Sequence, residues 1–297
     1  MIEKNAEKNA EKNAMALKAW LTRCPPEQRA ALERFLSEGE RSYLDTFPAV
    51  DIAAEPDAYE TIAPLDKIHW SWFIPILKTY AEKDQKLFLS ALDLHAAGQL
   101  RSALHIDTPL EPVTEMGKTY LEQTLMQSLL EEGEQILPEE FLPASPLNRL
   151  VRLSKQDLIR LINYLSLYDL CAEVRQIVET KVLKKISNCL SQEQRAALQT
   201  IAAKPPETQP FPRMGLDRNW DGTEEGLQVL LHRRGLARLA IALSGQHPDL
   251  IWTLCHHLDV GRGGSLAKLC GKEPIAGISE IAIHQVGESL HWLNGKG

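Results

Sequence analysis

The sequence lacks an apolar run long enough to cross a membrane. Its longest apolar runs, LARLAIAL (236–243) and WSWFIPIL (70–77), have eight residues each, whereas a membrane-spanning helix needs about 20. The amino terminus also lacks the apolar core of a secretory signal. We therefore expect a cytoplasmic protein without a membrane-inserted segment.

Cysteines are few, and none is spaced as CxxC. The chain has an odd number of them, and each lies among Leu, Ile or Ala on a helical pattern: Cys24, Cys171, Cys189, Cys255 and Cys270. Disulfide frameworks need cysteines in pairs, and zinc sites need regular Cys and His spacings. We expect reduced, buried thiols, with no metal and no cofactor.

An excess of positive charge is also missing. The chain has 33 Lys and Arg residues against 40 Asp and Glu residues, and its formal net charge is −7. Such a balance gives no general attraction to nucleic acids or anionic lipids. We expect no nucleic-acid partner and no small-molecule substrate, because an established catalytic signature is absent and the paired carboxylates lie in an acidic, solvated connector. The chain is therefore predicted not to be an enzyme.

What is present is helical periodicity along nearly the whole chain. No segment shows the sustained alternation and turn chemistry of a sheet. The hexapeptide EQRAAL occurs at 27–32 and again at 193–198, and the stretch at 68–80 is echoed at 246–258. Internal echoes of this kind favour short helices stacked in a right-handed superhelix of the armadillo or HEAT type. The predicted fold class is all-α.

Composition divides the chain into segments. Residues 1–14 repeat Glu-Lys-Asn-Ala three times without a large apolar side chain, which predicts a disordered low-complexity extension. A proline- and glycine-rich stretch at 205–224 predicts a linker. Between them we predict an N-terminal helical domain (15–106), an acidic connector with a helix (107–146) and a middle helical domain (147–204). An armadillo-like helical domain follows at 225–297.

Two motifs invite a chemical interpretation. Cys255, His256 and His257 are potential zinc ligands, but consecutive helical residues point about 100° apart and cannot converge on one ion. We expect Cys255 to face the core and the histidines to lie at its edge or in solvent.

The second motif, DVGRGGSLAKL at 259–269, is predicted to be a glycine-rich turn with Ser265 as the N-cap of the next helix. Its backbone N–H groups offer a weak anion-binding site, but the GxxxxGK[ST] spacing and a preceding strand are missing. The candidate residues are Gly261, Arg262, Gly263, Gly264 and Ser265.

The stretch LARLAIALSGQHPDLIWTLCHHLDVGRGGSLAKL (236–269) resembles the armadillo-like motif of the FliG family of flagellar motor switch proteins. In that motif a Glu-His-Pro-Gln tetrapeptide opens a helix, and a leucine-rich helix pair follows. The resemblance implies a non-enzymatic scaffold or adaptor of a bacterial type III secretion or flagellar cytoplasmic complex. The tetrapeptide lies near the carboxyl end, with no room for a torque domain after it. A FliG-like scaffold of a non-flagellar apparatus, of the SctK kind, is therefore preferred to a rotor.

The resemblance also implies protein partners: membrane-ring, C-ring or sorting-platform components that hold the chain at the inner face of the membrane. A proline in the first helical turn loses no hydrogen bond and leaves polar side chains displayed. The predicted protein-binding residues are Gln246, His247, Pro248, Asp249 and Trp252. Two alternatives stay open: a regulatory adaptor or chaperone that binds export clients in an apolar groove, and a nucleotide-binding protein that uses the Gly261–Ser265 turn.

Overall fold

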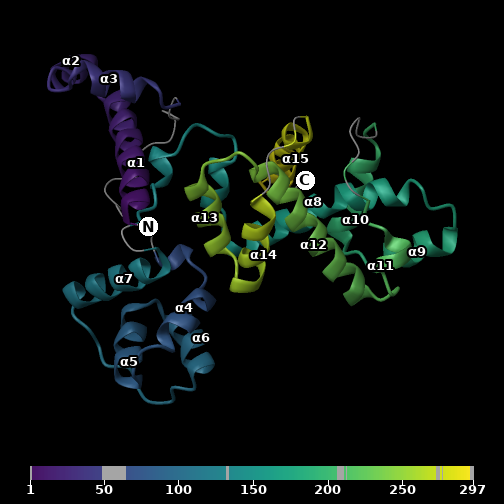
Figure 1. Cartoon of the computed structure of the whole chain (residues 1–297). Coiled ribbons are helices and arrows are strands. Elements are labelled where there is room, and N and C mark those ends of the chain that lie inside the picture. The colour runs from purple at the N-terminus through teal and green to yellow at the C-terminus, as the bar shows by residue number, and fades with distance from the viewer. Residues whose placement is uncertain are drawn as a thin grey trace. The chain divides into compact units, whose positions relative to one another are not determined.

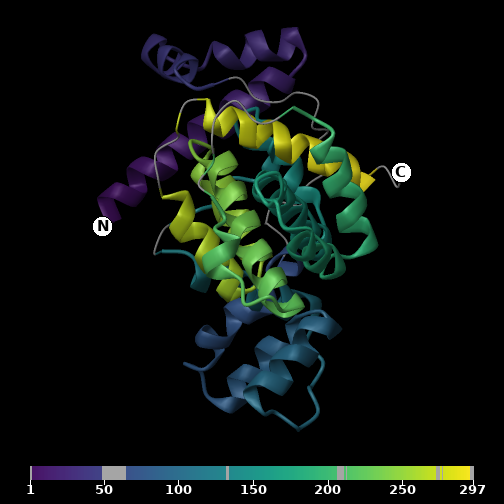
Figure 2. The same ribbon diagram turned by 90° about the vertical axis from the view of Figure 1, so that its right-hand side faces the viewer.

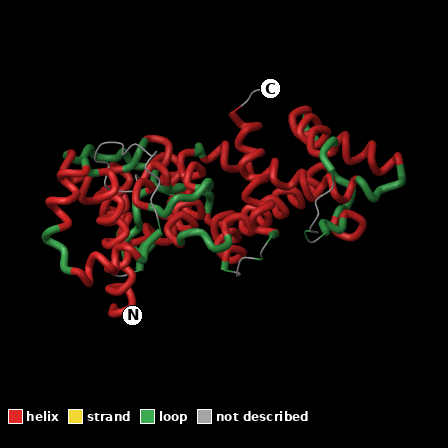
Figure 3. The backbone as a smooth tube through the Cα atoms, turned by 90° about the horizontal axis from the view of Figure 1, so that it is seen from above, coloured by secondary structure: helices red, strands yellow, loops and turns green. Residues whose placement is uncertain are grey.

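The computed structural model describes residues 2–48, 65–131, 134–205, 211, 213–271, 275 and 277–294. Helices account for 73% of the structure, and the described residues form no strand (Figure 3). The all-α prediction is confirmed. None of the described helices has both the length and the apolar character that a membrane span requires.

The chain divides into two compact units, and the division is not contiguous in sequence. Unit 1 comprises residues 1–151 and 247–260, and unit 2 comprises residues 152–246 and 261–297. The predicted boundaries followed composition and therefore kept 225–297 together. In the structure, the helix that begins at Pro248 belongs with the amino-terminal half of the chain instead.

Unit 1 contains eight α-helices among its described residues (Figure 1). They are α1 (Ile2–Arg23), α2 (Pro26–Glu33), α3 (Glu38–Asp45), α4 (Phe73–Leu77), α5 (Glu82–Ala91), α6 (Leu94–Leu104), α7 (Glu115–Leu129) and α13 (Pro248–His257). Short 3-10 turns, η1 (Leu65–Lys67), η2 (Trp70–Trp72) and η3 (Glu139–Phe141), connect them. One core is built from α4 to α7, with Phe73, Leu77 and Leu125 buried in it and Trp252 of α13 packed against it.

The amino-terminal repeat is helical, so the prediction of a disordered extension over 1–14 is wrong. Ala, Glu and Lys favour helices intrinsically, and the helix α1 continues into Met15 and Ala19, which are buried. Lys12 is buried as well, with its Nζ 3.0 Å from an Asp249 carboxylate oxygen. The ion pair with Asp249, which is distant in sequence, thus gives the repeat a tertiary contact, although the repeat has no large apolar side chain.

Unit 2 is organised around two long helices, α8 (Lys155–Val174) and α12 (Glu224–Leu243). The helix α15 (Ile278–Asn294) packs against both (Figure 2), and α10 (Gln192–Ala202) packs against α8. The remaining helices are α9 (Thr180–Asn188), α11 (Leu216–Asn219) and α14 (Val260–Cys270), and the 3-10 turn η4 (Asn148–Arg152) spans the sequence boundary between the units. The core of unit 2 includes Leu167, Leu170 and Leu227.

The predicted linker at 205–224 is only partly a connection. Residues 206–210 and 212 lie outside the described part of the chain. Beyond them, Met214 and Leu216 are buried in the core of unit 2, and α11 begins at Leu216. These apolar residues explain why the stretch folds onto unit 2 despite its prolines and glycines, since burial of a large apolar side chain is worth about 1.5–3 kcal/mol.

The cysteines lie largely where the helical pattern places them. Cys171, Cys189 and Cys255 are buried, as predicted, whereas Cys24 and Cys270 are half-buried. Burial raises the pKa of the Cys270 thiol to about 11, which keeps it protonated at neutral pH.

Candidate functional site

The predicted docking residues open helix α13 in unit 1. His247 is the N-cap, with φ −57° and ψ 135°, and its Nδ1 accepts a hydrogen bond from the Asp249 N–H at 3.2 Å. Pro248 occupies the first helical turn and is exposed, where its missing N–H is no loss. Burial lowers the pKa of His247, although the Asp249 carboxylate acts in the opposite direction.

Asp249 does not share this exposure, so the prediction that the tetrapeptide is displayed as a whole is wrong. Its side chain is 4% exposed. One carboxylate oxygen accepts the Leu137 N–H at 2.8 Å, and the other lies 3.0 Å from Lys12 Nζ. Gln246 is half-buried. The Asp249 carboxylate therefore fixes the start of α13 to α1 and to the connector before η3, inside unit 1.

Cys255, His256 and His257 do not gather at one point. Cys255 faces the core as predicted, but His257 is also buried, which corrects the expectation that both histidines reach the edge or solvent. The His256 ring stacks on Trp252, with 3.8 Å between ring centroids, and its centroid lies 4.2 Å from that of Trp72. Burial lowers the pKa of His256. Among the described residues, no cluster of three or more ligand side chains suits a metal ion.

The glycine-rich stretch is helix, so the prediction of a turn with Ser265 as N-cap is wrong. Helix α14 already begins at Val260. Ser265 lies in its second turn, where the hydroxyl donates to the Gly261 carbonyl at 2.8 Å. Arg262 Nε donates to His232 Nε2 at 3.0 Å. Only the first turn of a helix leaves its N–H groups outside the helical ladder, and Ser265 lies beyond it.

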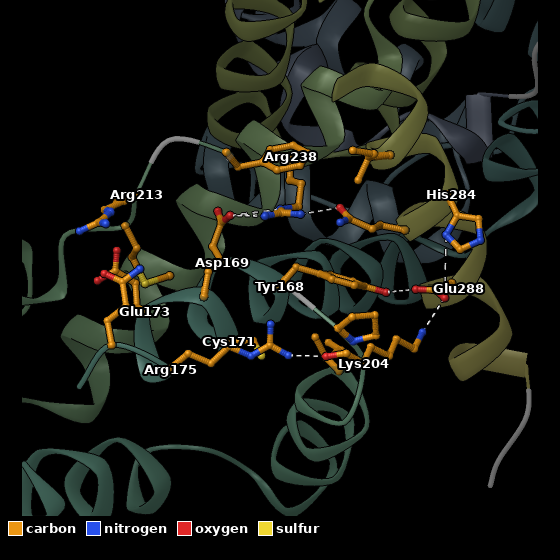
Figure 4. Close-up of a pocket in the computed structure, with 18 residues that line it drawn as sticks. Tyr168, Asp169, Cys171, Glu173, Arg175, Lys204, Arg213, Arg238, His284 and Glu288 are labelled. Atoms are coloured by element: carbon orange, nitrogen blue, oxygen red, sulfur yellow. Dashed lines mark hydrogen bonds and ion pairs between the residues drawn. The ribbon is translucent and has the colours of Figure 1, made fainter. Parts of the chain in front are cut away.

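Sequence patterns missed a pocket of about 620 Å³ in unit 2 (Figure 4). Side chains from α8, from the end of α10, from α12 and from α15 line it, together with residues just before α11. The apolar part of the wall includes Cys171, Ile201, Met214 and Ile281. The pocket therefore combines an apolar interior with charged side chains from α8, α12 and α15 and from the segments after α8, after α10 and before α11.

A closed ionic network forms one wall of the pocket. Arg238 of α12 is 2% exposed, and its guanidinium forms an ion pair with the Asp169 carboxylate of α8. Its Nη1 donates to Gln285 Oε1 at 2.5 Å, and its flat face lies 3.9 Å from the Phe211 ring centroid. Arg234 Nε donates to the second Asp169 oxygen at 2.7 Å. The buried charge of Arg238 is thus matched by the Asp169 carboxylate within unit 2, as a buried ion requires.

A second group surrounds Glu288 of α15. The Tyr168 hydroxyl donates to one of its oxygens at 2.6 Å, and Lys204 Nζ donates to the other at 2.5 Å. His284 Nδ1 lies 3.8 Å from the same carboxylate. Burial alone would raise the pKa of Glu288, but the hydrogen bonds from Lys204 and Tyr168 outweigh it and leave the pKa below its usual value. Burial and the Glu288 carboxylate raise the pKa of the Tyr168 hydroxyl.

Two further arginines line the pocket without a carboxylate partner among the described residues. Arg175 Nη2 donates to the Ala202 carbonyl at 3.0 Å and to the Lys204 carbonyl at 2.6 Å, which are both neutral. Arg213 is exposed. The nearby Glu173 accepts the Gly215 N–H at 3.0 Å and forms an ion pair with neither arginine. Two arginines and one carboxylate without a charged partner in the described part of the chain thus leave an excess of positive charge at the pocket.

No protein-family model matches the chain, and comparisons with curated proteins and with solved structures find no match either. The likeness to the FliG family therefore rests on the sequence pattern around 236–269, and the function it implies stays a prediction.

Proposed function

We propose that this chain is a non-enzymatic helical adaptor that binds protein partners through exposed helix faces. The observation that carries the proposal is a second apolar face on α7. Met116 and Tyr120 lie one turn apart and are 85% and 68% exposed. Residues four apart share one face of a helix, so the two side chains form a single apolar patch.

This patch is distinct from the face with which α7 packs. Leu121, Leu125 and Leu129 pack in the core of unit 1, and at about 100° per residue they lie on the side of the helix opposite Met116. Burying a large apolar side chain is worth about 1.5–3 kcal/mol, and aromatic residues are enriched among the energetic centres of interfaces. A partner that covers both side chains would gain several kcal/mol.

The sequence resemblance extends the proposal to a particular setting. In this setting, the chain is a FliG-like or SctK-like scaffold of a type III secretion or flagellar complex. Its short helices stack in an armadillo- or HEAT-like superhelix. Ring or stator components hold it in the cytoplasm at the inner face of the membrane. His247 and Pro248 are a second proposed contact for such partners, with Asp249 holding them in place from inside unit 1.

The test is affinity purification from the native host, followed by mass spectrometry. The double variant Met116→Gln, Tyr120→Gln removes the patch on α7. Val178→Gln is the matched control, because Val178 is also apolar and is 93% exposed, but belongs to unit 2. We expect the wild type and the control to recover secretion-ring or stator proteins and the double variant to lose them, with unchanged thermal unfolding.

Equal recovery by the double variant and the control would contradict the role of the patch. Recovery of a metabolic enzyme complex by the wild type would contradict the secretion setting.

A further inference from the structure

The pocket of unit 2 has the size and lining of a small-molecule site. Its volume of about 620 Å³ lies within the range of roughly 300–1,000 Å³ that is typical of such sites. Ile201, Met214 and Ile281 supply apolar side chains from three separate segments, and charged groups stand around them. An apolar interior with a few convergent polar groups is the usual composition of a ligand pocket.

Of the three carboxylates that line the pocket, Asp169 and Glu288 are engaged by cations of the chain, whereas Glu173 accepts only the Gly215 N–H among the described residues. Asp169 is held by Arg234 and Arg238, and Glu288 by Tyr168 and Lys204. Both carboxylates therefore carry internal counter-charges, and a bound cation would have to displace them. The same contacts occupy the Arg238 and Lys204 side chains. An anion could bind to either cation only by weakening its ion pair with Asp169 or Glu288.

Arg175 and Arg213 differ from those two cations. The Arg175 guanidinium is oriented by neutral carbonyls, which position it without cancelling its charge. Arg213 has neither a hydrogen bond nor an ion pair with any part of the chain that the structure describes. In Figure 4 Arg213 lies beside Glu173 on the side of the pocket away from His284 and Glu288, and the Arg175 side chain extends toward Lys204. Arg175 and Arg213 thus carry two positive charges against the single carboxylate, that of Glu173, which has no charged partner among the described residues, and this excess of positive charge favours an anionic group there.

We propose that this pocket binds a small amphipathic acid, with an apolar chain against Ile201, Met214 and Ile281 and a carboxylate facing Arg213 and Arg175. An arginine fork pairs with a carboxylate through two N–H groups at once, which gives orientation as well as affinity. The proposal concerns binding and assigns no reaction. It is independent of the adaptor function, because that function rests on α7 in unit 1.

The test uses isothermal titration calorimetry on the full chain with three ligands of the same chain length: decanoate, 1-decanol and decyltrimethylammonium. All are kept below the concentrations at which they form micelles. We expect decanoate to bind at least tenfold more tightly than decanol, since a hydrogen bond to a charged group is worth about 1.5–3 kcal/mol. The cation is expected to bind most weakly of the three.

Two variants and one control assign the site. Arg213→Ala should weaken decanoate about tenfold and leave decanol unchanged. Arg218→Ala is the matched control, because Arg218 is 87% exposed on α11 and does not line the pocket. This variant should bind decanoate and decanol as tightly as the wild type. Ile281→Trp fills the apolar part and should abolish binding of both ligands.

Equal affinities for decanoate and decanol, binding that Arg213→Ala does not change, or no binding of any of the three ligands would each overturn the proposal. Because Arg213 is exposed, its replacement leaves the fold intact, and the outcome does not depend on whether Ile281→Trp folds.

Discussion

The contact between α8 and α12 gives the sharpest stability prediction, at Gly235. A Cβ atom there would lie 1.9 Å from the carbonyl oxygen of Ile162 on α8, a separation that real Cβ contacts essentially never show. Gly235→Ala therefore forces two packed backbones apart by about 1 Å. Overpacking of a core costs about 1–3 kcal/mol, occasionally more, whereas the helix propensity of Ala returns at most about 1 kcal/mol. We expect a net destabilisation of about 2 kcal/mol.

The assay is equilibrium urea unfolding followed by circular dichroism. Gly98→Ala on α6 is the matched control, because a Cβ there meets nothing within 4 Å. The control should be neutral or should stabilise the protein by up to about 1 kcal/mol, as expected for an unstrained helical glycine. If the two variants behaved alike, the close packing of α12 on α8 would be refuted, and with it the placement of Arg238 beside Asp169.

The remaining predictions concern buried ionisable groups. Asp169→Asn leaves Arg238 buried without its counter-charge and should lower the free energy of unfolding by about 3–5 kcal/mol. Asp157→Asn changes an exposed ion pair and should lower it by less than about 1 kcal/mol in the same urea assay. Burial lowers the pKa of His256 in the folded state, so its contribution to stability is complete above an unfolded pKa of about 6.5 and is lost as pH falls below it. The urea concentration at the unfolding midpoint should decrease as the pH is lowered from 7 to 5, and His256→Asn should make this decrease smaller. If the decrease is the same in the variant, His256 is not the group responsible, and His247 accounts for the loss of stability instead.

Local signals in the sequence predicted local structure well. A serine followed three residues later by a glutamine, as at Ser191 and Gln194, is the sequence pattern of a capping box, and α10 begins with that box. Ser154 likewise accepts the Asp157 N–H at the start of α8. Caps and helical periodicity depend on residues a few positions apart, so a single sequence contains the information needed to locate them.

The contacts that sequence reasoning missed join distant residues. Asp249 was expected on a surface because it follows a proline in the first turn of a helix, and nothing in the amino-terminal repeat marks Lys12 as its buried partner. Arg238 lies in the apolar run LARLAIAL, and a charge inside such a run was the one available hint of a buried ion pair. Its partner Asp169 sits in another apolar stretch of α8. Helical periodicity places each residue on a face but does not say which two faces meet.

The glycine-rich stretch was missed for a different reason. Gly261, Gly263 and Gly264 have poor helix propensity, each by about 1 kcal/mol relative to Ala, which favoured a turn. The neighbouring Leu266 is fully buried in α14. Tertiary packing supplies most of the stability of short helices, and here it outweighs the local preference of the glycines.

The measurement that tests the adaptor proposal most directly is the amount of ring or stator protein recovered from the native host by the Met116→Gln, Tyr120→Gln variant relative to Val178→Gln. Replacing a hot-spot residue of an interface costs about 2 kcal/mol or more of binding free energy. We therefore predict that recovery of the ring or stator protein falls at least about tenfold, while the thermal unfolding of the two variants stays the same. Equal recovery of those partners by both variants would contradict the account.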